Sequence, residues 1–279
     1  MLTITQIKQL LRDYGLRPNK RLGQNFIIDR NIVEKIIKFA NLSAADTILE
    51  IGAGLGNITT DLAGLVNNVI AVEFDKGLCN LIKKTLSNYK TIEVVCQDIL
   101  KFDIKAYAQK NKFKVLGNLP FYITTPVLEY LMKNRDYISG ALLMVQKELG
   151  ERLLAGPGGK VYGAISCYLN YYTRLEFKSV VKRTSFFPQP DVDSVLLHME
   201  ILDEPPVAVG DERLFFNIIR TAFNQRRKTL LSSLSHKDIL SLDKGQIKNV
   251  LNNAGISPER RPESLSLEEF ARISNGFRG

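Results

Sequence analysis

Five short apolar runs in the first half of the chain are the feature that most constrains its fold. They predict strands at Thr47–Ile51, Val69–Glu73, Ile92–Cys96, Phe113–Gly117 and Ala141–Val145, with helix-length segments between them. A further helix, indicated by apolar residues at helical spacing over Asn31–Ala40, precedes the first of these strands. Strands that alternate with helices form a mainly parallel, doubly wound sheet, so we expect an α/β fold with helices on both faces.

The remainder of the chain changes character twice. Two more strands are predicted at Glu176–Lys182 and Ser194–Ile201, joined by a proline-rich turn at Phe187–Pro190, and they suit an antiparallel edge hairpin. A linker with two prolines and a glycine follows at Asp203–Gly210, and beyond it only helical periodicity is found. The expected organisation is therefore a basic N-terminal segment (1–30), a catalytic domain (31–205) and a small all-helical C-terminal domain (206–279).

Positive charge is concentrated at the two ends. Of the net charge of +9, residues 1–30 contribute six basic against two acidic residues and residues 211–279 contribute twelve against eight, while residues 31–210 carry twenty against nineteen. A near-neutral body with basic flanks suits an enzyme core that binds nucleic acid, although the same charges could simply keep the chain soluble. The candidate phosphate-binding residues are Lys20, Arg21, Arg226, Arg227 and Lys228, with Arg260 and Arg261 as secondary candidates, and a solvated-surface role stays open for each of them.

Several classes of protein are disfavoured by what the sequence lacks. No apolar run approaches the roughly 20 residues that span a bilayer, and charged residues interrupt the first twenty positions, so we expect a cytoplasmic chain without a membrane segment. The cysteines and histidines have no metal-binding spacing and no disulfide framework. We therefore expect no metal site. The three cysteines, Cys79, Cys96 and Cys167, are expected to be buried thiols, and the two histidines are His198 and His236.

A glycine-rich turn follows the first strand directly. Gly52, Gly54 and Gly56 are spaced two apart, and Asn57 occupies the place where a dinucleotide-binding loop would need its third glycine. Two acids follow the next two strands at the same rim: Glu73 can accept from ribose hydroxyls and Asp98 from an adenine amine. A glycine turn with two carboxylates fits S-adenosylmethionine, which needs no phosphate cradle, whereas ordinary loop acids are the alternative reading.

The stretch after the fourth strand, Gly117-Asn-Leu-Pro-Phe-Tyr122, carries the most chemistry. An adenine amine is a poor nucleophile, and two acceptors aimed at its hydrogens would hold it and direct its lone pair toward a methyl donor. Asn118 offers a side-chain carbonyl, and Pro120 stiffens the turn that presents the main-chain carbonyl of Leu119. Phe121 could stack on an extruded base. The alternative is a plain turn, since Asn and Pro are common turn residues.

A second aromatic site is suggested by Ser185-Phe-Phe-Pro-Gln-Pro190. One of its two phenylalanines could cover the other face of the base. A hydrophobic turn that packs the edge hairpin explains the same residues equally well.

These motifs together resemble the KsgA-type small-subunit ribosomal RNA adenine N6,N6-dimethyltransferases, from about Arg17 to near the end of the chain. The resemblance also rests on further segments: Lys20-Arg-Leu-Gly-Gln-Asn-Phe26, Glu50-Ile-Gly-Ala-Gly54, Gln146-Lys-Glu148, Gly156-Pro157, Tyr162-Gly163, Phe186 to Ser194 and Ala222-Phe-Asn-Gln-Arg-Arg-Lys-Thr229. It implies a Rossmann-like, S-adenosylmethionine-dependent methyltransferase sheet followed by a helical RNA-binding domain.

The resemblance also implies roles for individual residues. Asn25 and Ile27 line the methyl-donor site, which Gly52, Glu73, Asp98 and Asn118 complete, and Asn118, Leu119 and Pro120 hold the amine. Phe121 and Phe186 form the stacking pair. The implied substrate is two adjacent adenosines near the 3′ end of 16S rRNA, each dimethylated in a late assembly intermediate of the small subunit by an enzyme we expect to be monomeric.

The chain departs from the family pattern in a few places. Phe121 stands where a tyrosine is usual, so a phenol hydroxyl is missing, and Tyr122 is expected to point elsewhere. Residues 1–16 have no clear counterpart and suit a flexible or helical extension. Two other functions stay open: a DNA adenine methyltransferase, which would usually have Pro-Pro where Leu119 and Pro120 stand, and an assembly or transcription factor that kept the fold without turnover.

Overall fold

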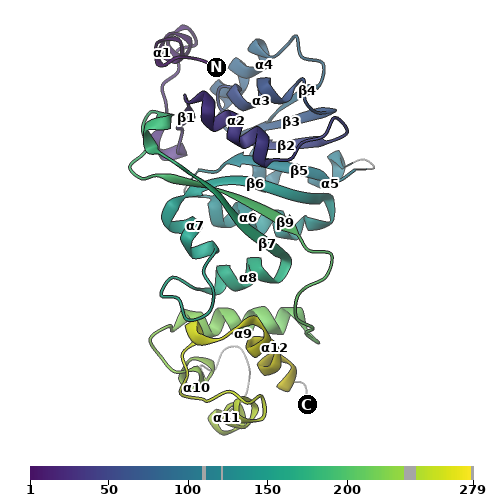
Figure 1. Cartoon of the computed structure of the whole chain (residues 1–279), viewed down its shortest axis with the longest axis vertical. Coiled ribbons are helices and arrows are strands. Elements are labelled where there is room, and N and C mark those ends of the chain that lie inside the picture. Colours follow the sequence, from purple (N-terminus) through teal and green to yellow (C-terminus); the bar gives the residue numbers. More distant parts are fainter. Residues whose placement is uncertain (109–110, 121, 236–242, 278–279) are drawn as a thin grey trace. The chain divides into compact units, whose positions relative to one another are not determined.

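The computed structural model of the chain (Figure 1) describes residues 1–108, 111–120, 122–235 and 243–277. The chain divides into two compact units: unit 1 comprises Met1–Gly150 and Leu175–Ile201, and unit 2 comprises Glu151–Arg174 and Leu202–Gly279. Two positions discussed above, Phe121 and His236, lie outside the described residues.

A seven-stranded mixed sheet forms the centre of unit 1. Its order is β4-β3-β2-β5-β6-β9-β7, in which β4, β3, β2, β5 and β6 pair in parallel and β9 runs antiparallel to β6. The strands are β2 (Thr47–Ile51), β3 (Asn68–Glu73), β4 (Ile92–Cys96), β5 (Phe113–Asn118), β6 (Ile138–Gln146), β7 (Thr173–Val181) and β9 (Ser194–Ile201). All seven predicted strands are confirmed, and β7 lies beside β9 at the sheet edge, where the hairpin was expected.

Helices cover both faces of this sheet, as predicted. Figure 1 shows α2, α3 and α4 over one face and α6 over the other. The apolar side of α2 packs Val33 and Ile36 against Ile48 and Val69 of the strands, so the 3.6-residue period seen in the sequence is the period of burial. The helices are α2 (Arg30–Phe39), α3 (Asn57–Leu62), α4 (Lys76–Thr85), α5 (Ile104–Tyr107), α6 (Thr124–Lys133) and α7 (Lys147–Leu153), with short 3₁₀ turns η2 (Ile99–Lys101), η3 (Arg135–Tyr137) and η4 (Arg183–Ser185).

The N-terminal extension is helical. Helix α1 (Ile4–Asp13) begins at Thr3, whose hydroxyl accepts from the Gln6 N–H while the Gln6 side chain accepts from the Thr3 N–H, a capping box. Its apolar side buries Ile7 and Leu11 in one cluster with Leu78 and other residues of α4. The turn η1 (Lys20–Leu22) then leads to β1 (Phe26–Ile27), which pairs antiparallel with β8 (Phe186–Phe187).

Unit 2 is built mainly from helices: α8 (Ala164–Tyr172), α9 (Glu212–Asn224), α10 (Leu230–Leu234), α11 (Lys244–Asn253) and α12 (Leu267–Gly276), with the turn η5 (Pro262–Ser264). Among the described residues after Ile201, no strand occurs, as the sequence predicted. Unit 2 also includes residues 151–174, which the sequence assigned to the catalytic domain. The physical reason is aromatic packing: the Tyr171 ring lies 5.2 Å from that of Phe215 and 5.1 Å from that of Phe216, centroid to centroid.

None of the helices formed by the described residues is both long enough and apolar enough to cross a bilayer.

Candidate active site at the carboxyl ends of the parallel strands

The glycine turn after β2 requires glycine at several positions. Gly52, Gly54 and Gly56 have φ values of 75°, 60° and 76°. A Cβ at Gly54 would lie 3.3 Å from the Phe26 ring, and one at Gly56 would lie 3.2 Å from Leu86. A side chain at either position would therefore be both strained and crowded, and the bare backbone of the turn is left to face the site.

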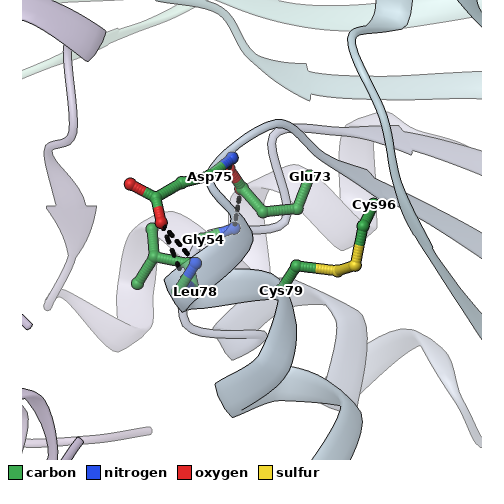
Figure 2. Close-up of a disulfide and its surroundings, with 7 residues drawn as sticks. Gly54, Glu73, Asp75, Leu78, Cys79 and Cys96 are labelled. Carbon is green, nitrogen blue, oxygen red and sulfur yellow. Dashed lines mark hydrogen bonds between the residues drawn. A yellow bond between two sulfur atoms is a disulfide. The ribbon is translucent and has the colours of Figure 1, made fainter.

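The carboxylate of Glu73 braces this turn. Glu73 ends β3 and is only 7% exposed. Its Oε2 accepts from the Gly54 N–H at 2.9 Å and its Oε1 from the Asp75 N–H at 2.8 Å, as Figure 2 shows. Burial raises the pKa of Glu73, and the two backbone N–H groups oppose that rise. The side chain thus fixes the loop geometry and keeps lone pairs for a ligand.

Asp98 lies just beyond the end of β4, as predicted. Its Oδ1 accepts from the Leu100 N–H at 3.0 Å, which caps η2 and sets the direction of the carboxylate. A cavity of about 900 Å³, open to solvent, brings together most of the residues assigned to the methyl donor: Asn25, Gly52, Gly54, Glu73, Asp98 and Asn118. We name it the rim cavity.

A second cavity of about 560 Å³ adjoins the first, because Asn25, Gly52, Gly54 and Asn118 line both. It extends under the glycine turn and is also lined by Ile27, whose main-chain carbonyl accepts from the Asn57 amide at 2.9 Å. We name it the inner cavity.

Glu50 lines the inner cavity and is a functional candidate to which the sequence analysis gave no role. The residue is 3% exposed, and its Oε2 has no hydrogen-bond partner among the described residues. Burial raises the pKa of Glu50 to about 7; the nearby Thr59 hydroxyl opposes this rise, and the charge of Glu73 adds to it. A buried acceptor without a partner is costly, so it marks a place for a cationic or hydrogen-bonding ligand group. The sequence feature that could have revealed Glu50 is an acidic residue within an otherwise apolar strand.

The turn after β5 holds Asn118 in a defined orientation. The Asn118 Nδ2 donates to the Asn25 carbonyl at 3.1 Å, which leaves its Oδ1 as the acceptor of that side chain. The Leu119 N–H donates to the Met144 carbonyl at 3.0 Å, and the Thr124 hydroxyl donates to the Pro120 carbonyl at 3.0 Å. The turn is therefore anchored on both sides of the main-chain carbonyl of Leu119. Phe121, the expected stacking residue, lies outside the described residues.

Tyr122 differs from expectation. Its side chain is 54% exposed and lines the rim cavity instead of pointing elsewhere. Burial, followed by the charges of Asp98 and Glu73, raises the pKa of its phenol. The sequence predicts the preceding residue, Phe121, as the aromatic wall, whereas the Tyr122 ring also lines the site.

The β1/β8 pair places the second predicted aromatic segment beside β1, whose residues Phe26 and Ile27 line the cavities. Ile27 pairs with Phe186 and Phe26 with Phe187. Phe186 is 4% exposed, packs with Ile27 in the core and lines neither cavity, so its stacking role stays a prediction. Phe187 packs instead toward α1, where the Lys8 Nζ lies 5.5 Å from the centroid of its ring.

Two predicted cations of unit 1 stand next to the rim cavity. Lys20 and Arg21 belong to η1, are exposed, and pair with no acid in the described part of the chain. The next residues, Leu22 and Gly23, line the rim cavity.

The predicted cations of unit 2 are of two kinds. Arg226 donates from Nη2 to the carbonyls of Lys160 and Tyr162, at 2.8 and 2.9 Å, and so tethers a loop of its own unit. Arg227 and Lys228 are exposed, and neither forms an ion pair or side-chain hydrogen bond with the described residues.

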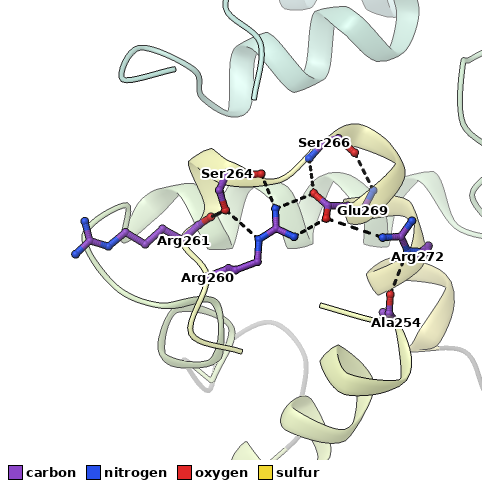
Figure 3. Close-up of polar contacts among 7 residues, drawn as sticks. All are labelled: Ala254, Arg260, Arg261, Ser264, Ser266, Glu269 and Arg272. Atoms are coloured by element: carbon purple, nitrogen blue, oxygen red, sulfur yellow. Dashed lines mark hydrogen bonds and ion pairs between the residues drawn. The ribbon is translucent and has the colours of Figure 1, made fainter. Parts of the chain in front are cut away.

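The secondary candidates Arg260 and Arg261 differ in the same way, as Figure 3 shows. Arg260 forms a bidentate pair with Glu269, with Nη2 to Oε2 at 3.0 Å, and also donates to the Ser264 carbonyl at 2.6 Å. This guanidinium lowers the pKa of Glu269. The Arg261 side chain extends away and has no partner among the described residues.

The cysteines require a correction. Cys79 of α4 and Cys96 of β4 form a disulfide with a Cα–Cα distance of 5.7 Å, seen beside Glu73 in Figure 2, so the expectation of three free thiols is wrong. Sequence spacing could not reveal the pair, because helix packing on the strand brings the two residues together. Cys167 is a free, buried thiol, as expected. Within the described part of the chain, no three His, Cys, Asp or Glu side chains gather to hold a metal ion.

Comparison with known proteins adds independent findings. A family model described as ribosomal RNA adenine dimethylase matches residues 15–278. The ribosomal RNA small subunit methyltransferase A of Moorella thermoacetica is 44% identical over 274 residues, covering 95% of this chain and 94% of that protein. The structure of a dimethyladenosine transferase from Plasmodium falciparum has a TM-score of 0.74 at 26% identity, covering 89% and 95%. The 23S rRNA methyltransferase ErmE shares the fold, with a TM-score of 0.70 at 22% identity, covering 91% and 100%.

Proposed function

The chain belongs to the ribosomal RNA adenine dimethylase family, and on that premise we propose that it is an S-adenosylmethionine-dependent enzyme that dimethylates the N6 amines of adenosines in small-subunit ribosomal RNA. The observation that supports this most strongly is the orientation of Asn118, whose amide Oδ1 is left as the acceptor at the junction of the two cavities.

The two cavities fit the methyl donor. In the rim cavity, Glu73 would accept from the ribose hydroxyls and Asp98 from the adenine amine. In the inner cavity, the unpartnered Oε2 of Glu50 would accept from the ammonium of the amino-acid tail, with Asn25 and Ile27 beside it. The bound sulfonium supplies an electrophilic methyl group, so the chain needs no nucleophile of its own.

The turn after β5 would hold the target amine. The Oδ1 of Asn118 and the main-chain carbonyl of Leu119 would each accept one N6 hydrogen, which orients the nitrogen lone pair toward the methyl group. Hydrogen bonds to Asn25, Met144 and Thr124 fix this turn before substrate arrives. The cost of ordering these acceptors is therefore met during folding.

The substrate is proposed in more detail from the resemblance. It is two adjacent adenosines near the 3′ end of 16S rRNA in a late small-subunit intermediate, modified in the cytoplasm by a monomeric enzyme. The identity of 44% to a protein named ribosomal RNA small subunit methyltransferase A supports the choice of subunit. Phe121 and Phe186 are proposed to stack on the extruded base.

Phosphate contacts are proposed for the cations that the fold leaves available. Lys20 and Arg21 lie beside the rim cavity, and Arg227 and Lys228 are their counterparts in unit 2. Arg226 would act mainly by holding the loop that it tethers.

One labelling experiment tests the function. The wild-type chain and its Asn118→Ala variant are incubated with methyl-labelled donor and, separately, unmodified small subunits, naked rRNA and duplex DNA. Label in adenines of the subunits that disappears in the variant supports the proposal. Label in DNA would favour a DNA methyltransferase, and label in no substrate would favour an assembly factor without turnover.

A further inference from the structure

Helices α1 and α4 together present a predominantly basic surface. The apolar sides of the two helices pack together, since Ile7 and Leu11 are buried in one cluster with Leu78, Leu81 and Ile82. Their outer sides therefore remain for solvent or a partner. The exposed cations there are Lys8, Arg12 and Arg17, which belong to or follow α1, and Lys76, Lys83 and Lys84 of α4. We name these six residues the α1/α4 basic face.

The charges of this face are not neutralised within the protein. None of its six cations pairs with an acid among the described residues. Two acids of the same helices count against this charge. Asp13 at the end of α1 accepts from the Gln9 amide at 2.6 Å, and Asp75 at the N-cap of α4 accepts from the Gln24 amide and from the backbone at the start of α4. Six basic residues against two acidic ones give the face an excess of positive charge, which suits a polyanion.

The face also adjoins the proposed site. Lys8 lies over the ring of Phe187, which pairs with Phe26, and Phe26 lines the rim cavity. Leu78 of α4 lines the rim cavity itself. A strand of nucleic acid that delivers a base to this cavity would thus have its flanking phosphates within reach of the two helices.

We propose that the α1/α4 basic face binds the RNA backbone next to the target adenosine. This inference rests on the proposed function and extends it to residues 1–14, which the matching family model does not cover. Phosphate contacts position the substrate without reading its sequence, so the face would supply affinity and orientation for a base chosen elsewhere.

Salt-dependent binding provides the test. The affinity of the full-length chain for unmodified small subunits is measured over a range of salt concentrations for Lys8→Gln/Arg12→Gln/Arg17→Gln. The matched control is Lys38→Gln/Lys105→Gln/Lys133→Gln, three exposed cations that likewise have no partner among the described residues. Each lost phosphate contact lowers the log–log salt slope by about 0.7 to 0.9, so we expect a decrease of about 2 for the first variant and little change for the control.

Further arms distinguish the outcomes. Lys83→Gln/Lys84→Gln should lower the salt slope by about 1.5. This double variant leaves α1 unchanged, so it tests the proposal even if the triple variant disturbs that helix. The same losses with protein-free 16S rRNA would support RNA as the partner, and losses confined to protein-containing subunits would overturn it. Equal slopes for basic-face and control variants, with the wild-type chain still methylating subunits, would overturn this inference alone. A wild-type chain that methylates no subunit would overturn the proposed function instead.

Discussion

The two units use their charged groups in opposite ways. In unit 1, two acids near the strand ends line cavities: Glu73 is held by backbone N–H groups, and one oxygen of Glu50 has no partner in the part of the chain that the structure describes. In unit 2, two of the arginines that look like RNA ligands are committed to the fold, Arg226 to main-chain carbonyls and Arg260 to Glu269. A count of charges therefore says little about binding until each group's partners are known.

The largest effect is expected at Asn118, a polar residue of unit 1 that lines both cavities. If its amide holds the target amine, Asn118→Ala should lower kcat by about 100-fold or more while changing the Kd for the methyl donor much less. Steady-state kinetics with small subunits and calorimetry with the donor separate the two effects. Asn80→Ala, an exposed asparagine on α4, is the control. Equal losses of kcat and of donor affinity would contradict the assignment.

The buried acid of the inner cavity makes a prediction about pH. The pKa of Glu50 rises from 4.5 to about 7 on folding, so between these values the folded chain holds a proton that the unfolded chain has released. Stability should therefore fall as pH rises through this window, by about 3 kcal/mol in total, and Glu50→Gln should remove that loss. Denaturant unfolding at pH 5 and pH 8 measures it, and parallel pH dependences for both chains would refute it.

The adjacent pair Arg260 and Arg261 sharpens the distinction within unit 2. Arg260→Ala should lower the free energy of unfolding by about 2 kcal/mol, because it leaves the partly buried Glu269 with only the more distant Arg272, at 3.9 Å, as an ion-pair partner. Arg261→Ala should change it by less than about 0.5 kcal/mol. Urea denaturation of the two variants provides the measurement, and similar losses in both would show that Arg260 is not a structural residue.

A smaller effect on stability is expected at the second pair of adjacent arginines in unit 2, Arg226 and Arg227. Arg226→Gln removes two hydrogen bonds to carbonyls and should lower stability by about 1 kcal/mol. Arg227→Gln should leave stability unchanged and lower the salt slope of subunit binding by about 0.7 to 0.9. Thermal melting and a salt titration together test both statements. Unchanged subunit binding in Arg227→Gln would remove this residue from the RNA contacts.

The predictable part of the molecule is the part governed by local patterns. Apolar runs located every strand of the sheet, and the glycine turn with Glu73 and Asp98 located one rim of the site, because the carboxyl ends of parallel strands must meet. The Cys79–Cys96 disulfide and the assignment of α8 to unit 2 were missed, since both depend on how separate elements pack together, α4 with β4 and α8 with α9.

The roles of individual polar residues were predictable only where the motif itself fixes the geometry. Asn118 is such a case, because the turn positions it. Arg260 is not, since its partner Glu269 lies nine residues away on another element, and neither residue's local sequence signals the pair. Glu50 could have been noticed as an acid within a buried strand, but only its missing partner shows that it faces a cavity.

A crystal structure of the chain with S-adenosylhomocysteine and an adenosine-containing RNA would test the central claim most directly. The account predicts that the Asn118 Oδ1 and the Leu119 carbonyl each lie within hydrogen-bond distance of the adenine N6, about 2.7–3.2 Å. An N6 amine held by other groups, with the Asn118 side chain directed away from it, would contradict the account.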